Sequence, residues 1–143
     1  MNRRRKGKMM LAFSKEWIDA LAEKLKDDEK YQEAAVGFDS LFQFIIEPEP
    51  DKGVSERKEV GIKLPECDET WEGVRDDVDF TMSGRYGVYV DVLTGKIGAT
   101  RAIAMRKLKV KGNLANLLKF KRAIDRYVEV LGEVDSEFEG DYA

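Results

Sequence analysis

The chain of 143 residues contains no histidine and a single cysteine, Cys67. Histidine is the usual general base, the partner of serine and cysteine nucleophiles, and the commonest metal ligand in proteins. Cys67 therefore has no imidazole to activate it, and one thiolate is too few for a zinc site or an intramolecular disulfide. Because Cys67 follows Pro65 and Glu66 at a predicted turn, we expect an unreactive structural thiol.

Acidic side chains are frequent, and Asp76, Asp77 and Asp79 are close enough in sequence for a general acid/base pair. They fall in a polar connection before a predicted strand, where a solvated run of charge is the commoner outcome. The segment Thr94-Gly95-Lys96 lacks the earlier glycine and the strand-to-helix setting of a phosphate-binding loop. We therefore expect no enzyme, no metal and no cofactor, and an enzyme that uses these carboxylates is kept as a third hypothesis.

Large, flexible apolar side chains are the residues in excess. Aromatic rings and methionines can line a cavity with adaptable walls, but the same residue types also fill a solid core, so the sequence leaves both arrangements open. The candidate ligand-binding residues are Phe42, Phe44, Trp71, Phe80, Met82, Tyr86, Val90, Ile103, Met105, Leu108, Val110, Leu117 and Phe120.

The length and composition are those of one domain, with 43% hydrophobic and 37% charged residues. We expect a basic N-terminal tail over residues 1–12, a folded domain over residues 13–132 and an acidic C-terminal tail over residues 133–143. The acidic tail is expected to be disordered. The basic start is either a solvated tail or a contact for an anionic membrane or a nucleic acid.

The formal net charge of −3 gives no reason to expect nucleic acid as a partner. No apolar run approaches the ~20 residues of a membrane span, and no signal peptide is recognised. These features lead us to expect a cytoplasmic protein.

Hydrophobic periodicity and capping residues divide the chain into alternating helices and strands. The predicted helices cover residues 14–26, 29–36, 85–94, 100–105 and 113–132. The predicted strands cover residues 41–47, 56–64, 70–74, 78–83 and 107–111. The last helix is predicted to bury Leu114, Leu117, Leu118, Ile124, Val128 and Leu131 and to carry Lys119, Arg122 and Arg126 on a basic outer face.

The strand at residues 107–111 alternates fully, with three lysines on one face and Leu108 and Val110 on the other. Such alternation is typical of a sheet with one buried face, and we expect Leu108 and Val110 to point toward the helices. The first three strands are close enough in sequence to pair as an antiparallel meander. The predicted fold is therefore α+β, with a single, mainly antiparallel five-stranded sheet covered by helices mainly on one side.

The chain resembles the sterol carrier protein type two family over roughly residues 13–131. Phe44-Ile45-Ile46-Glu47 and Leu93-Thr94-Gly95-Lys96 are two of the matching pieces. The others are Tyr31-Gln32-Glu33-Ala34-Ala35, the segment DVDFTMSG at residues 77–84 and the segment KLKVKGNL at residues 107–114. The family commonly has a glycine just before the alternating strand, where this chain has Arg106.

The resemblance implies a hydrophobic tunnel between sheet and helices, in which family members hold sterols, fatty acids, acyl-CoA or phospholipids without chemistry. It thus suggests a non-catalytic lipid-binding or lipid-transfer protein for a fatty acyl, sterol-like or isoprenoid ligand, with transient membrane contact. Each buried methylene contributes ~0.8 kcal/mol, so that an acyl chain can be held without specific polar contacts. The alternative is an accessory interaction module for a lipid-metabolism enzyme, with a closed or vestigial cavity. The oligomeric state is left open.

Overall fold

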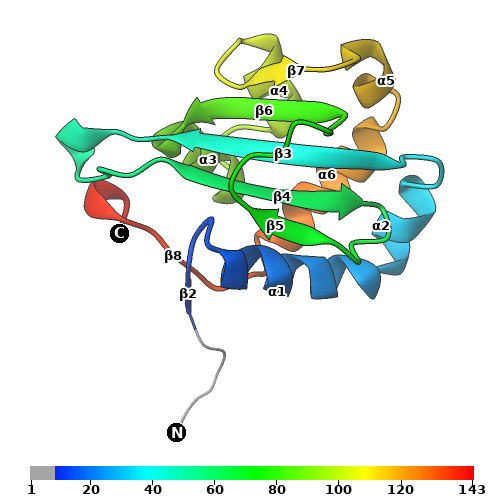
Figure 1. Ribbon diagram of the computed structural model, residues 1–143, viewed down its shortest axis with the longest axis horizontal. Coiled ribbons are helices and arrows are strands. Elements are labelled where there is room, and N and C mark those ends of the chain that lie inside the picture. The colour runs from blue at the N-terminus through cyan, green and yellow to red at the C-terminus, as the bar shows by residue number, and fades with distance from the viewer. Residues whose placement is uncertain (1–8) are drawn as a thin grey trace, which may run out of the picture.

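The computed structural model describes residues 9–143, so that the basic run at residues 3–8 lies outside the described residues. A single five-stranded sheet forms the centre of the fold (Figure 1). Its strands are β3 (Ser40–Glu47), β4 (Lys58–Leu64), β5 (Thr70–Glu72), β6 (Phe80–Arg85) and β7 (Lys109–Lys111). The helices are α1 (Lys15–Lys26), α2 (Glu29–Ala34), α3 (Tyr86–Leu93), α4 (Ala99–Ala104), α5 (Leu114–Leu118) and α6 (Lys121–Leu131).

The strand order is β5-β4-β3-β6-β7, and the pair β3 and β6 is parallel whereas the other three pairs are antiparallel. The first three strands form the expected meander, and the predicted α+β class with a mainly antiparallel five-stranded sheet is confirmed. The parallel pair arises because β6 returns to the far side of β3 after the long connection that follows β5.

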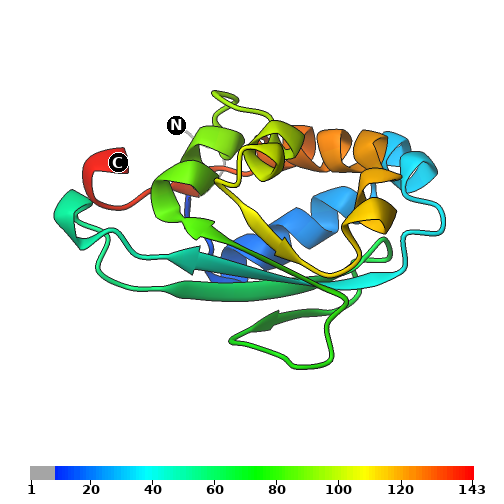
Figure 2. The same ribbon diagram turned by 90° about the horizontal axis from the view of Figure 1, so that it is seen from above.

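The helices lie on one face of this sheet (Figure 2). Side chains that alternate along the strands are directed to the helix layer, and Phe42 lies opposite Ile62 on one neighbouring strand and Phe80 on the other. All three are nearly fully buried. Leu108 is also buried, and Val110 is half-buried against the core, so that the predicted inner face of the alternating segment is confirmed.

The first helix begins where its capping residue predicts. The hydroxyl of Ser14 accepts a hydrogen bond from the backbone N–H of Trp17 at 3.2 Å. The apolar stripe of α1 is buried at Trp17, Leu21 and Leu25 and packs against β4 and β5. This helix therefore closes one edge of the space between the sheet and the outer helices.

Trp71 lies on the opposite, outer face of the sheet. It is the cross-strand partner of Gly61, whose neighbours on β4 point their side chains into the helix layer. The indole Nε1 donates a hydrogen bond to Oε1 of Gln43 at 3.0 Å. Gln43 is fully buried, and its amide nitrogen donates to the carbonyl of Gly73 at 3.0 Å. Both the oxygen and the nitrogen of this buried amide therefore have hydrogen-bond partners.

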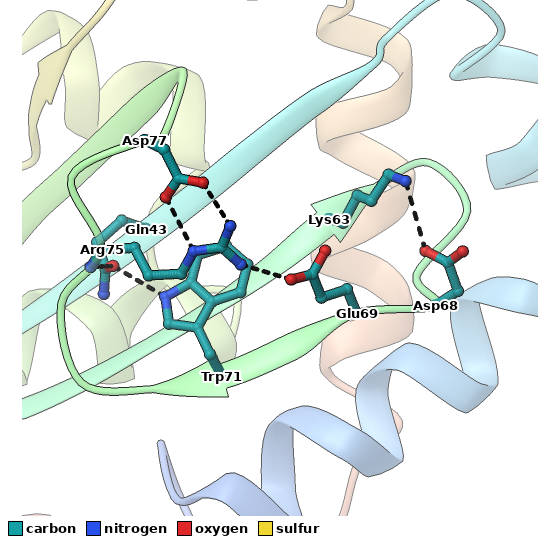
Figure 3. Close-up of polar contacts among 7 residues, drawn as sticks. All are labelled: Gln43, Lys63, Asp68, Glu69, Trp71, Arg75 and Asp77. Atoms are coloured by element: carbon teal, nitrogen blue, oxygen red, sulfur yellow. Dashed lines mark hydrogen bonds and ion pairs between the residues drawn. The ribbon is translucent and has the colours of Figure 1, made fainter.

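Arg75 covers the outer surface of this indole, with its guanidinium carbon 4.5 Å from the ring centroid (Figure 3). Glu69 and Asp77 hold the guanidinium from two directions, at 2.6 and 2.5 Å. The hydrogen bonds from Arg75 lower the pKa of the Asp77 carboxyl. The connection at residues 65–79 is therefore clamped onto the outer face of the sheet, and Trp71 belongs to this clamp.

The predicted last helix is broken into two. Asn113 caps α5 as expected, through a 3.1 Å bond from the backbone N–H of Asn116. The chain then turns at residues 119–120 before α6 begins. A break of this kind rotates the apolar stripe. Leu117 stays buried, but Leu114 and Leu118 are 41% and 42% exposed, so that their predicted burial is wrong.

The acidic C-terminal segment is ordered, which differs from our expectation of disorder. Its short strand β8 (Ser136–Glu137) pairs in parallel with β2 (Met10–Leu11). Val134 is buried, and the hydroxyl of Tyr142 donates to Oε1 of Glu49 at 3.1 Å. Apolar and hydrogen-bonding side chains that alternate with the acidic ones hold the segment against the domain.

Candidate functional site

An apolar cavity of about 70 Å³ lies between the inner face of the sheet and the helix layer. Side chains of the central strands, Phe42, Phe44 and Met82, form one wall. Helix α6 forms the opposite wall through Ala123, Ile124, Tyr127, Val128 and Leu131. The remaining lining residues are Tyr31, Phe38, Leu64, Tyr89, Val92, Leu93, Ala99, Ile103, Leu108 and Leu117.

The cavity has no charged side chain among its lining residues, and its only polar groups are three phenols. Burial raises the pKa of Tyr31, Tyr89 and Tyr127, which therefore remain neutral at every physiological pH. The hydroxyl of Tyr89 donates to the carbonyl of Met82 at 2.9 Å. The buried hydroxyl of Tyr31 has no hydrogen-bond partner among the described residues. Such walls can hold hydrocarbon but offer no acid, base or nucleophile.

A second apolar cavity of about 30 Å³ adjoins the first. Phe44, Tyr89, Leu93, Tyr127 and Leu131 line both cavities, so that their side chains form the partition. Phe44 and Tyr127 face each other across this partition, with ring centroids 6.3 Å apart and ring planes inclined by 28°. Typical ligand sites enclose about 300–1,000 Å³, and both cavities are much smaller. A lipid would therefore need the rings of the partition to move aside.

Six of the predicted ligand-binding residues line the larger cavity. They are Phe42, Phe44, Met82, Ile103, Leu108 and Leu117. Two others support the wall: Phe80 stacks on Phe42 at 5.4 Å between ring centroids, and Phe120 stacks on Phe38 at 4.7 Å.

The other five predicted residues lie away from the cavity walls. Trp71 lies on the outer face of the sheet, since its register opposite Gly61 turns it away from the helices. Tyr86 and Val90 are buried elsewhere in the core, Val110 is half-buried at the edge strand, and Met105 is 49% exposed at the end of α4.

The residues that sequence reasoning missed lie mostly on helices. Tyr31, Tyr89 and Tyr127 line the cavity from α2, α3 and α6. The helical spacing of Tyr89 and Leu93, and the apolar stripe of Ile124, Val128 and Leu131, were signals that could have identified part of this wall.

Of the residues considered for chemistry, Cys67, Asp77 and Asp79 have structural partners instead. Cys67 is 1% exposed, and burial raises the pKa of its thiol to about 12. Its Sγ donates to the carbonyl of Pro65 at 3.3 Å, as expected for an unreactive thiol. Asp77 holds Arg75, and Asp79 accepts a 2.8 Å hydrogen bond from the backbone N–H of Leu41.

Among residues 9–143, no group of three acidic, cysteine or histidine side chains is arranged to hold a metal ion. In the same part of the chain, every helix is too short or too polar to cross a bilayer.

The fold matches solved structures of sterol carrier proteins. A crystal structure of sterol carrier protein 2 superposes with a TM-score of 0.78 at 24% identity, over 86% of this chain and 98% of that one. A solution structure of a conserved hypothetical protein from Thermus thermophilus, described as a possible sterol carrier protein, has a TM-score of 0.78 at 25% identity, over 92% and 94% of the two chains. A ubiquinone synthesis protein, UbiJ-SCP2, shares the fold at 16% identity and a TM-score of 0.52, over 76% and 84%.

No curated protein matches the sequence significantly. The sequence model of the SCP-2 sterol transfer family, by contrast, matches residues 18–125, which include every lining residue of the larger cavity except Tyr127, Val128 and Leu131. The chain therefore belongs to the SCP-2 sterol transfer family, a family of lipid-binding domains.

Proposed function

We propose that this protein is a non-catalytic lipid carrier that holds a fatty acyl, sterol-like or isoprenoid ligand between its sheet and its helices. The observation that carries the proposal is the apolar cavity, whose walls come from the central strands β3 and β6 and from helix α6. Membership of a lipid-binding family supports the same function. The absence of a charged residue from the walls favours a ligand recognised by its hydrocarbon part.

The energetics favour such a ligand even though the cavity encloses only about 70 Å³. A dozen buried methylenes contribute roughly 10 kcal/mol before the costs of association and of displaced side chains. Phe44, Tyr127 and Val128 are only partly buried, so that displacing them costs less than displacing fully buried side chains. We propose that the ligand joins the two small cavities into one by moving these side chains.

The small cavity also gives a reason to consider a second function. A closed core suits an accessory module that binds an enzyme of lipid or isoprenoid metabolism rather than a lipid, and a ubiquinone synthesis protein has the same fold. We prefer the carrier, because a cavity whose walls are apolar except for three phenols is better suited to hydrocarbon than to water. The site of action that we propose for either function is the cytoplasm, with transient contact with a membrane.

Mass spectrometry of lipid extracted from the purified protein is the experiment that tests the carrier. We expect one co-purifying lipid class at a near-stoichiometric amount, and displacement of a fluorescent fatty acid by that lipid. The absence of both co-purifying lipid and fluorescent fatty acid binding would overturn the proposal. Stable association with a lipid-metabolism enzyme in a pull-down, together with that absence, would support the accessory module.

A further inference from the structure

One segment of the described chain carries positive charges and no negative charge. Between Val92 and Ile124 there are nine lysines and arginines and not one aspartate or glutamate. Removing these nine charges from the formal net charge of −3 leaves −12 for the rest of the chain. The molecule is thus strongly polarised, although its net charge is small.

The fold brings this segment together along one edge of the molecule. Its elements are α4, β7 and α5, which lie side by side along the upper edge in Figure 1 and face the viewer in Figure 2. All nine cationic side chains are exposed. Only Lys121 forms an ion pair with a described residue, Asp125, at 2.7 Å. The charges therefore remain available to an outside partner.

Apolar side chains are exposed on the same edge. Met105 at the end of α4 is 49% exposed, and Leu114 and Leu118 of α5 are 41% and 42% exposed. Leu114 and Leu118 are exposed because the helix breaks after α5. We call these three residues and the seven cationic residues from Lys96 to Lys119 the basic edge. Lys121 and Arg122 are left out, because they lie on α6 and Arg122 borders a separate hollow with Glu33, Asp125 and Glu129.

The two short helices of the basic edge also line the cavity. Ile103 of α4 and Leu117 of α5 line the cavity from the same short helices that expose Met105 and Leu118. On its other side, Arg85, Arg106, Lys107 and Lys109 surround an open hollow of about 400 Å³ together with Glu47. Glu47 is itself held 3.7 Å from Arg57, so that the hollow remains predominantly basic.

We infer that the basic edge is the surface by which this protein docks on an anionic lipid bilayer. Lysines and arginines near such a membrane are attracted to its negative surface, and exposed large apolar side chains beside them enter the boundary between head groups and acyl chains. A nucleic acid would use the cations but would give Met105, Leu114 and Leu118 no apolar partner. Docking through this edge places the helices that line the cavity against the membrane, where a lipid enters or leaves. The inference rests on the proposed carrier function and adds the surface and its partner.

Co-sedimentation with vesicles tests the inference. The full chain is mixed with phosphatidylcholine vesicles that contain either no anionic lipid or about one third phosphatidylserine, and binding of a fluorescent fatty acid is measured separately without vesicles. We expect binding to the anionic vesicles only, weakened as salt is raised. The variant in which Lys107, Lys109 and Lys111 are all replaced by Glu should bind these vesicles at least about tenfold more weakly. Its fatty acid binding should stay unchanged, because none of the three lysines lines the cavity and all three are exposed.

The matched control replaces Lys24, Lys30 and Lys52 by Glu. These lysines are also exposed and without an ion-pair partner among residues 9–143, but they lie outside the basic edge. The control should bind vesicles as the unaltered protein does. An equal loss in the control, or no vesicle binding by the unaltered protein, would overturn the inference. If the unaltered protein does not bind the fluorescent fatty acid at all, the carrier function is overturned instead.

Two further sets of variants separate the contribution of the apolar side chains and that of the N-terminal basic run from the contribution of the lysines. Replacing Met105 and Leu118 by Ser should remove the part of vesicle binding that persists at about 0.5 M salt, since apolar insertion is not screened by ions. Each variant is repeated with Arg3, Arg4, Arg5, Lys6 and Lys8 replaced by Ser, so that this separate basic run does not mask the result. Tighter binding to a duplex oligonucleotide than to anionic vesicles would overturn the membrane as the partner.

Discussion

Trp71 and Gly61 lie opposite each other on β5 and β4, and the indole ring occupies the space that a side chain at Gly61 would need. A Cβ atom at Gly61 would lie 2.1 Å from Cε2 of Trp71, far inside the contact distance of two carbon atoms. The indole of Trp71 therefore covers the outer face of the sheet at this point, and it fits there because position 61 has no side chain. The indole also donates a hydrogen bond to Gln43 of strand β3.

Replacement of Gly61 by Val should expel the indole from this face. The hydrogen bond between Trp71 and Gln43 would break and leave a buried amide oxygen with one donor fewer, which costs about 1–3 kcal/mol. Loss of indole packing adds to this cost, and we expect the free energy of unfolding to fall by about 2–4 kcal/mol in urea titrations. Gly98→Ala is the control, because no atom lies within 4 Å of the added Cβ, and it should change stability by less than about 0.5 kcal/mol.

Filling the cavity should weaken ligand binding without lowering the free energy of unfolding. Ala123 on α6 is fully buried and lines the larger cavity. The Ala123→Leu variant should occupy much of the unfilled volume, keep or slightly raise the free energy of unfolding, and weaken fluorescent fatty acid binding about tenfold. Ala104→Leu makes the same change at an exposed position of α4 and should affect neither quantity. Undiminished binding by Ala123→Leu would show that the ligand lies elsewhere.

Loss of the hydroxyl group should change stability differently at Tyr31 and at Tyr89, two of the three phenols in the cavity wall. The hydroxyl of Tyr31 has no partner among the described residues, so Tyr31→Phe removes an unsatisfied polar group and should leave stability unchanged or raise it by up to about 1 kcal/mol. Tyr89→Phe removes a 2.9 Å hydrogen bond to Met82 and should lower it by about 1 kcal/mol. Thermal unfolding of both variants without ligand makes the comparison. A large loss in Tyr31→Phe would mean that its hydroxyl has a partner in solution.

Asp28 should contribute a definite pH dependence to stability. Bidentate hydrogen bonds from Arg126, at 2.8 and 2.5 Å, lower the pKa of this carboxyl to about 2. The folded pKa lies below the unfolded value of 3.8, so the stabilisation is present above pH 4 and is lost as the pH falls from about 4 to 2. The pair is partly solvated, and we expect its contribution to be only about 1 kcal/mol.

Asp28→Asn keeps a side-chain oxygen that can cap α2 but removes the charge. The variant should be less stable than the unaltered protein at pH 7 and nearly equal to it at pH 2, in parallel unfolding titrations. Asp27→Asn, at the exposed neighbouring position, serves as the control and should follow the unaltered protein at both pH values.

The strands and their inward faces could be predicted because alternation is a local property. The segment at residues 107–111 places Leu108 inward whatever its neighbours are. The face of the sheet on which Trp71 lies was harder to predict, because β5 has only three residues and its alternation is too short to identify a buried face. The register of Trp71 opposite Gly61 decides that face. That register depends on contacts between segments that are distant in sequence.

The last helix and the acidic segment show the same limit. Leu114 and Leu118 continue the helical spacing of α6, and the turn at residues 119–120 that exposes them contains no glycine or proline to mark it. Ser136 and Tyr142 give the acidic segment its contacts through Trp17 and Glu49, which are more than ninety residues away in the chain. Arg126, expected on a free basic face, is instead held by Asp28.

The parallel pairing of Met10 with Ser136 links two segments that are distant in sequence. Its main-chain hydrogen bonds run from the N–H of Met10 to the carbonyl of Asp135 at 3.1 Å and from the N–H of Ala12 to the carbonyl of Glu137 at 3.0 Å. They join the segment before α1 to the segment after α6, and both helices border the smaller cavity. The pairing therefore acts as a strap that limits how far α6 can move away from α1 at this end.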